Sequence, residues 1–102
     1  MAGIRFEWDE IKNRANQRKH GIGFEQASRV FFDPLHFSVL ERIENGEERW
    51  RTFGMIDISM VVVVAHTIHE LNGEGEAIEV VRIISARETT RKERRFYEDE
   101  NG

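Results

Sequence analysis

Apolar and polar residues alternate at the start of the chain, which is the pattern of a β-strand that buries one face. The alternation covers residues 3–8, and its apolar side carries Ile4, Phe6 and Trp8. A second apolar pattern, over residues 24–31, has helical spacing. Its stripe consists of Phe24, Ala27, Val30 and Phe31. Asp33-Pro34 follows, and because the residue before a proline disfavours helical backbone, we expect the helix to end there.

The segment between these two elements has helical length and very few apolar positions. Asp9 is a good N-cap, and Gly21 suits the left-handed position after a helix C-terminus, so a helix is predicted over residues 10–20. Ile11 and Ala15 are its expected packing residues. Such a helix is either a solvated strut or carries a polar working surface.

Four strand patterns follow, joined by short turns. They cover residues 36–43, 47–54, 60–67 and 77–85. Asn45-Gly46 between the first two predicts a tight hairpin. The third pattern is apolar on both faces, so we place it at the centre of the sheet. A Gly- and Glu-rich turn over residues 70–76 leads to the fourth, and these short connections predict an antiparallel meander.

The last element is a second polar helix that begins near Thr90. Thr90 and Glu93 match the spacing of a capping box, and Phe96 and Tyr97 are its docking residues. The element order is therefore strand, two helices, four-stranded antiparallel meander and C-terminal helix. This order predicts an α+β domain with one sheet and helices packed on it.

Composition limits the classes of protein that need to be considered. The 102 residues fit a single domain over residues 1–102. There is no cysteine, which excludes disulfides, thiolate metal sites and cysteine nucleophiles. The longest apolar run is far shorter than the roughly 20 residues that span a bilayer, and the N-terminus lacks a signal-peptide pattern. We therefore expect a cytoplasmic protein with no membrane partner.

The net charge of −4 argues mildly against nucleic acid as a partner, but the basic residues are clustered. Lys12, Asn16 and Lys19 share one face of the first helix, and His20 lies on an adjacent stripe. Amide, ammonium and imidazole groups of this kind suit a phosphodiester. They are also what a fully exposed helix carries.

The second basic cluster lies late in the chain. Arg82 is placed inside an apolar strand, where an unpaired guanidinium is costly to bury. The guanidinium must pair with a carboxylate, reach solvent at the rim of the sheet or face an open concave surface. Arg87 lies five residues further on, which is the opposite face of a regular strand unless the backbone bends near residues 85–86. Arginine forks suit phosphate oxygens, and the alternative is a salt bridge to a Glu on a neighbouring strand.

The histidines give a weaker signal. His66, at the end of the central strand, is predicted to be a satisfied structural residue. His66 and His69 precede Glu70, but this order and spacing do not match a metalloprotease motif. No metal and no cofactor are therefore expected.

The segments considered together resemble the BrnT family. The resemblance rests on the early motif W-D-x-x-K-x-x-x-N-x-x-K-H-G and the late I-I-S-A-R, with residues 30–34 and 48–54 in the same order between them. It implies a RelE-like fold and a metal-independent ribonuclease toxin of a type II toxin–antitoxin system. The implied partners are RNA, a BrnA-like ribbon-helix-helix antitoxin, and operator DNA through the complex with that antitoxin.

The resemblance also implies roles for residues. Cleavage by the ribose 2′-hydroxyl needs a base, an acid and positive charge on the phosphate. The implied catalytic residues are Lys19, His20, Arg82 and Arg87, with the two arginines on the phosphate and Lys19 or His20 transferring a proton. The implied RNA-binding residues are Lys12, Asn16, Arg51 and Tyr97. Tyr97 and Glu48 are further candidates for proton transfer.

Two other functions stay open at this point. The chain could be an inactive toxin-like subunit that binds antitoxin and operator DNA but leaves RNA intact. It could also be an interaction domain whose basic clusters only keep it in solution.

Overall fold

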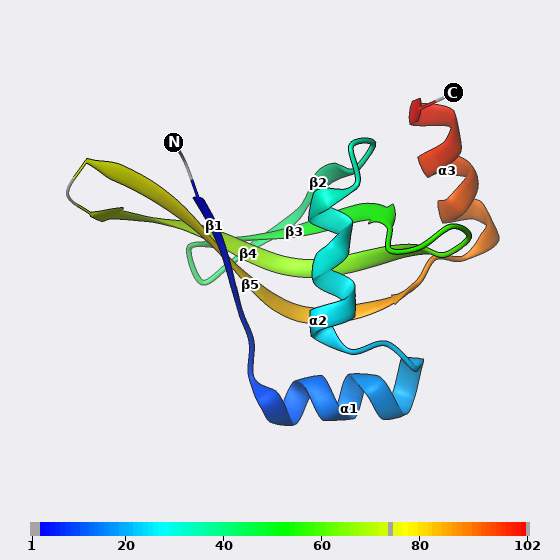
Figure 1. The fold of residues 1–102 in the computed structure, drawn as a ribbon, viewed down its shortest axis with the longest axis horizontal. Helices are drawn as coiled ribbons and strands as arrows, with labels where there is room; N and C mark the ends of the chain where they lie inside the picture. The colour runs from blue at the N-terminus through cyan, green and yellow to red at the C-terminus, as the bar shows by residue number, and fades with distance from the viewer. Residues whose placement is uncertain (1–2, 74, 102) are drawn as a thin grey trace.

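A computed structural model describes residues 3–73 and 75–101, and in these residues five strands form one mixed sheet with helices on both faces (Figure 1). The elements are β1 (Gly3–Glu7), α1 (Glu10–His20), α2 (Phe24–Ala27), the 3-10 helix η1 (Ser28–Phe32), β2 (Phe37–Glu44), β3 (Glu47–Met55), β4 (Val61–Gly73), β5 (Glu76–Glu88) and α3 (Arg91–Asn101).

The strand order is β1-β5-β4-β3-β2, so β4 is central as its apolar faces predict. Strands β2 to β5 form the expected antiparallel meander, and β1 pairs with β5 in parallel. β4 and β5 are longer than predicted and form an arm that extends beyond the end of β3 (Figure 1). Most of the predicted turn over residues 70–76 belongs to these strands, since β4 ends at Gly73 and β5 begins at Glu76. Glu74 lies outside the described residues.

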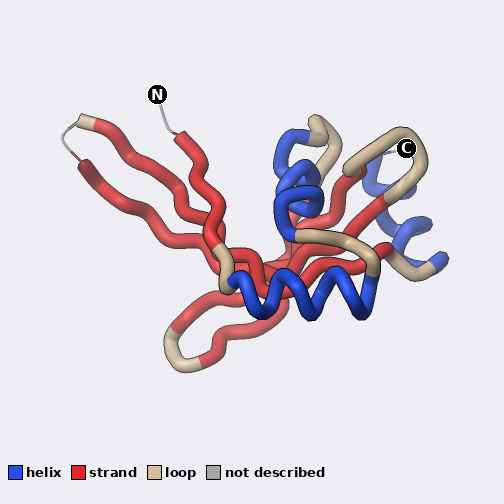
Figure 2. The backbone as a smooth tube through the Cα atoms, turned by 60° about the horizontal axis from the view of Figure 1, so that its bottom comes forward, coloured by secondary structure: helices blue, strands red, loops and turns tan. Residues whose placement is uncertain are grey.

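The larger core lies between the sheet and the layer of α1, α2 and η1 (Figure 2). Its buried side chains are Ile22, Phe24, Ala27, Val30, Ile56, Val62, Val64, Val81, Ile83 and Ala86. The stripe predicted for residues 24–31 supplies Phe24, Ala27 and Val30 to this core. The backbone there is not one α-helix, however, because α2 ends at Ala27 and continues as η1.

The opposite face of the sheet is covered in part by α3. Tyr97 of α3 packs with Phe53, Val61 and Val63 in a second, smaller core. The hydroxyl of Tyr97 donates a hydrogen bond to the carboxylate of Asp33, 2.6 Å away. Among the described helices, none has the length and apolar character needed to cross a bilayer.

The local signals in the sequence are confirmed. Asp9 caps α1 by accepting from two backbone N–H groups of its first turn, and Gly21 ends the helix at φ 73°. Asn45 and Gly46 both have positive φ, as a type I′ hairpin turn requires. Thr90 and Glu93 form the predicted capping box in both directions.

The packing of α1 was predicted wrongly. Ile11 is 77% exposed and Ala15 is exposed, whereas the buried residues of α1 are Asn13 and Asn16. A helix with apolar side chains outside and amides inside cannot be held by the hydrophobic effect alone. Hydrogen bonds of the two amides contribute to its attachment, Asn16 to the sheet and Asn13 to α2.

Asn16 joins α1 to the free edge of β5. Its Nδ2 donates to the carbonyls of Ile22, at 2.9 Å, and Ala86, at 2.7 Å, and its Oδ1 accepts from the N–H of Ala86 at 3.1 Å. The side chain thus pairs with β5 as a neighbouring strand would, beyond the point where β1 ends. Asn13 makes a similar contact, since its Oδ1 accepts from the N–H of Phe24 at 2.8 Å.

Candidate functional site

A bulge in β5 decides which face its arginines occupy. Thr67 pairs with Arg82 and Val63 with Arg87, and the register shifts by one residue at Ile84. Residues opposite each other in antiparallel strands share a face, and residues 63 and 67 of β4 lie on the same face. Arg82 and Arg87 therefore lie on one face, which a regular strand would not allow.

Strand β3 adds further arginines to this face. Arg51 pairs with Ala65, and Phe53 pairs with Val63. Arg49 precedes Arg51 by two residues and so points the same way. We call this surface the arginine face: Arg49, Arg51, Arg82 and Arg87. It lies opposite α1 and α2, because Val62 and Val64 of β4 point to the core under those helices.

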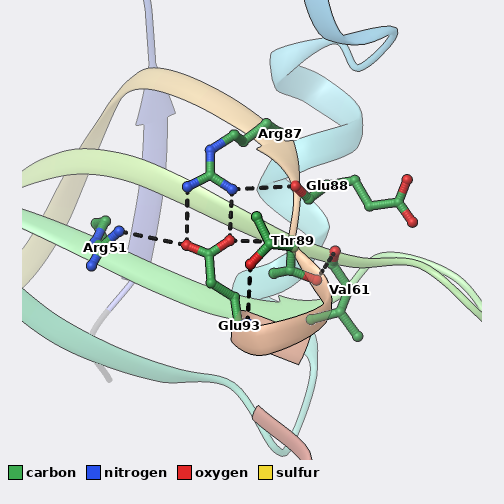
Figure 3. A network of polar contacts seen from close by, with 7 residues as sticks. Arg51, Val61, Arg87, Glu88, Thr89 and Glu93 are labelled. Carbon is green, nitrogen blue, oxygen red and sulfur yellow. Dashed lines mark hydrogen bonds and ion pairs between the residues drawn. The ribbon is translucent and has the colours of Figure 1, made fainter. Parts of the chain in front are cut away.

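Glu93, in the first turn of α3, holds two of these arginines (Figure 3). Its carboxylate accepts from both terminal nitrogens of Arg87, at 2.7 and 3.0 Å, and lies 3.7 Å from Arg51. The hydrogen bonds from Arg87 lower the pKa of Glu93 to about 2. The same pair raises the pKa of Arg87, so both groups stay charged and Arg87 is held in a fixed position.

The other arginines of this face are not held by a bidentate pair of this kind. The side chain of Arg51 makes no hydrogen bond within the described residues, and the Nε atoms of Arg49 and Arg51 are buried without a partner there. Arg82 makes a loose ion pair, 3.9 Å from Glu7 on β1, with 47% of its side chain exposed. This pair is the salt bridge considered above as the alternative, but exposed pairs of this length contribute little. Within the described chain, the terminal nitrogens of Arg51 and Arg82 make only these long ion pairs, so their N–H groups remain as donors for an anion.

A polar cavity of about 160 Å³ lies on the arginine face. Its lining residues are Glu41, Arg51, Val63, Ala65, Ser85 and Arg87. A second bulge, in β2, makes Glu41 the extra residue between Leu40 and Arg42. The cavity thus combines a carboxylate that could accept a proton with guanidinium groups that could hold a tetrahedral anion.

The helix candidates lie elsewhere. Lys12, Lys19 and His20 are exposed on α1, and no hydrogen bond or ion pair in the described chain links them to the arginine face. Asn16 does not lie on the exposed face where an RNA contact was expected. It is buried, and the backbone of Ile22 and Ala86 uses both ends of its amide. The expectation for Asn16 is therefore corrected to that of a clamp between α1 and β5.

Two further candidates are poorly suited to proton transfer. Burial and the hydrogen bond to Asp33 raise the pKa of Tyr97 to about 12, so its phenol stays protonated near neutral pH. Tyr97 is also 3% exposed, which leaves little surface for RNA. Glu48 precedes Arg49 on β3 and so points to the other face of the sheet.

His66 has the structural role that was predicted. It is fully buried, and its Nε2 lies 2.6 Å from the hydroxyl of Thr52. Burial lowers the pKa of His66 to about 4, so the ring is neutral. His69 is exposed and three residues further along β4. In the described part of the chain, no three His, Cys, Asp or Glu side chains come together as metal ligands.

Sequence reasoning missed Arg49, Glu41 and the contact of Glu93 with the arginines. The sequence could have shown that Arg49 and Arg51 lie on one face, because residues i and i+2 of a predicted strand share a face. The orientation of Glu41 depends on a bulge for which the sequence has no local signal. Glu93 was predicted as a cap, but its arginine partners lie on other strands.

The chain was also compared with known proteins. A sequence profile described as "Ribonuclease toxin, BrnT, of type II toxin-antitoxin system" matches residues 8–93. The crystal structure of the ribonuclease toxin BrnT from Brucella abortus is similar, with a TM-score of 0.54 and 22% sequence identity. The match covers 89% of this chain and 99% of the Brucella chain, and at that identity it shows a shared fold. Among curated protein sequences, none matches this chain.

Proposed function

Because the chain belongs to the BrnT family of ribonuclease toxins of type II toxin–antitoxin systems, we propose that it is an endoribonuclease and that the arginine face is its catalytic surface. The observation that carries the proposal is the position of the Arg51 side chain. Its guanidinium makes no hydrogen bond within the described residues, yet it lines a cavity together with Glu41 and Arg87. Arginine forks match phosphate geometry, and a phosphate placed there meets positive charge and a carboxylate together.

The proposed reaction is attack of a ribose 2′-hydroxyl on the adjacent phosphorus, without a metal. Glu41 accepts the hydroxyl proton, and Arg51 and Arg82 stabilise the charge that develops on the phosphate oxygens. The bond to the 5′-oxygen breaks, which leaves a cyclic 2′,3′-phosphate and a 5′-hydroxyl that takes a proton from water. Arg87, fixed by Glu93, lines the cavity with a guanidinium whose charge that carboxylate partly offsets. Lys12, Lys19 and His20 on α1 are proposed contacts to the RNA backbone away from the cleaved bond.

The test is cleavage of total RNA by the purified chain in EDTA, with and without ribosomes. We expect Arg51→Ala and Arg82→Ala to lower the cleavage rate by about 100-fold or more, as loss of a transition-state donor does. Arg29→Ala, an exposed arginine on η1 at the opposite face, is the matched control and should cleave like the parent. Thermal melting of each variant checks that the fold is retained.

Intact RNA in every reaction of the parent, ribosomes included, would refute the nuclease and favour a binding subunit without activity. Cleavage by the parent that Arg51→Ala and Arg82→Ala leave unchanged would refute the arginine face as the site. Arg51→Lys separates charge from geometry, because lysine keeps the charge and loses the planar fork.

Membership of a type II toxin family implies a protein antitoxin as partner. We propose that this partner is a BrnA-like ribbon-helix-helix protein and that operator DNA is bound only through their complex. The test is coexpression of the chain with the reading frame beside its gene. Copurification, relief of growth arrest and an operator shift that needs both proteins support the proposal. An operator shift by the chain alone would contradict it.

A further inference from the structure

An apolar cavity of about 290 Å³ lies beside the polar cavity of the arginine face. Its lining residues are Val39, Arg51, Phe53, Lys92, Glu93 and Phe96. Phe53 is buried in the small core, whereas Phe96 of α3 remains 46% exposed. This volume lies near the lower end of the range for small-molecule sites, roughly 300–1,000 Å³. An exposed aromatic side chain at such a cavity offers a surface that a flat apolar ligand can cover.

The aromatic rings at and next to this cavity pack against one another. The rings of Phe37 and Phe53 are stacked with centroids 5.1 Å apart, and Phe96 meets Phe37 edge-on at 5.4 Å. The guanidinium of Arg51 lies 5.8 Å from the centre of the Phe53 ring. Ring faces and guanidinium planes are the surfaces on which nucleobases stack, and such stacking accepts any of the bases.

The apolar and polar cavities are adjacent through Arg51, which lines both. The side chain of Lys92, exposed on the rim of the apolar cavity, has no hydrogen bond or ion pair within the described residues. A nucleotide has the same layout, since its flat base lies one sugar away from its charged phosphate. The two cavities therefore match the two chemical parts of one ligand.

We propose that the apolar cavity binds a nucleobase next to the cleaved phosphate, with the base against Phe96 and its phosphate on Arg51. This inference rests on the proposed ribonuclease function. The alternative occupant is an apolar side chain of the antitoxin. The base is favoured because two cations, Arg51 and Lys92, are among the lining residues, and because Arg51 also lines the polar cavity proposed to hold the phosphate.

The experiment measures binding of a short 2′-O-methyl RNA, which lacks the nucleophilic hydroxyl and cannot be cleaved. Anisotropy titrations compare the intact oligonucleotide with versions that carry one abasic nucleotide at successive positions. The proteins are the parent chain, Phe96→Ala, Phe96→Tyr and the control Phe32→Ala. Phe32 is an exposed phenylalanine, 67% accessible, on η1 at the other face of the sheet.

We expect one abasic position to weaken binding to the parent by about 5- to 150-fold, the usual effect of one stacked base. Phe96→Ala should bind the intact and abasic versions alike, whereas Phe32→Ala should behave as the parent does. Phe96→Tyr keeps the ring and should keep the dependence on the base, which guards against a loss that only reflects displacement of α3. The inference is overturned if no abasic position matters, or if Phe96→Ala keeps the full difference.

The same set of proteins separates this inference from the proposed function. Base-dependent binding that needs Phe96, without any cleavage of RNA, would keep the base cavity and reject the nuclease. Cleavage of RNA with the same pattern and KM by Phe96→Ala would keep the nuclease and reject the base cavity. An effect of Phe96→Ala on antitoxin affinity alone would assign the cavity to the antitoxin and overturn the inference.

Discussion

Asn16→Ala tests how much the hydrogen bonds of one buried amide contribute to holding α1 on the sheet. The substitution removes three hydrogen bonds, two to Ala86 and one to Ile22, and both of these residues are almost fully buried. A buried backbone group left without a partner costs about 1–3 kcal/mol. Three such groups lose a partner, and with partial repair by water we expect the free energy of unfolding to fall by roughly 3–5 kcal/mol. A domain of this size has a free energy of unfolding of about 5–15 kcal/mol, so the loss is large.

Urea denaturation followed by circular dichroism gives the free energy of unfolding of each variant. Lys12→Ala is the matched control, because Lys12 is exposed on the same helix and its loss should change stability by less than about 0.5 kcal/mol. A loss below about 1 kcal/mol in Asn16→Ala would refute the reasoning, since the backbone of β5 would then have other partners.

Asn16→Asp sharpens the test. The carboxylate still accepts from the N–H of Ala86, but it presents an oxygen where the amide donated to two carbonyls. We expect it to destabilise the fold at neutral pH at least as much as alanine does. Stability relative to the parent should return in part in acid, because a protonated carboxyl donates one hydrogen bond. A difference from the parent that does not change with pH would contradict this account.

Two titrations test the buried groups. The pKa of Tyr97 is about 12 in the folded chain, above its unfolded value of 10.0. The stability that protonated Tyr97 contributes is therefore complete below pH 10 and lost as pH rises through 12. Absorbance at 295 nm reads this directly because the chain has one tyrosine, and a folded midpoint near 10 would contradict it. The folded pKa of His66, about 4, lies below its ordinary 6.5, so stability falls by roughly 3 kcal/mol between pH 6.5 and 4. NMR of the histidine rings should show that the His66 ring stays neutral as pH falls to about 4. A titration midpoint of His66 near pH 6.5 would refute the buried neutral ring.

The parts of the fold that could be predicted are those with local signals. Asp9, Gly21, Asn45-Gly46 and the Thr90 capping box each depend on backbone within a few residues, and all of them are confirmed. The central position of β4 followed from its two apolar faces. For the caps and the turn, the partner that satisfies the signal lies nearby in the sequence, so the local pattern is enough to predict the structure.

The parts that could not be predicted depend on distant partners. Asn16 is polar and lies in a polar helix, and nothing near it indicates that it pairs with Ala86, 70 residues away. Glu93 has its nearest signal in the helix cap, while its contact with Arg51 needs the register of the whole sheet. Polarity alone therefore misassigned a structural amide to the surface and hid the partners of a carboxylate.

Two irregular backbone positions explain why the candidate site forms where it does. In a regular β5, Arg87 would point to the core under α1 and α2, where Ala86 now lies. The bulge at Ile84 reverses this and brings Arg87 to the face of Arg51. The bulge in β2 makes Glu41 an extra residue, and Glu41 lines the same cavity from the other side. A bulge re-aims side chains at a cost in regular pairing. The sheet has one such bulge on each side of Arg51, so both irregularities serve the same cavity.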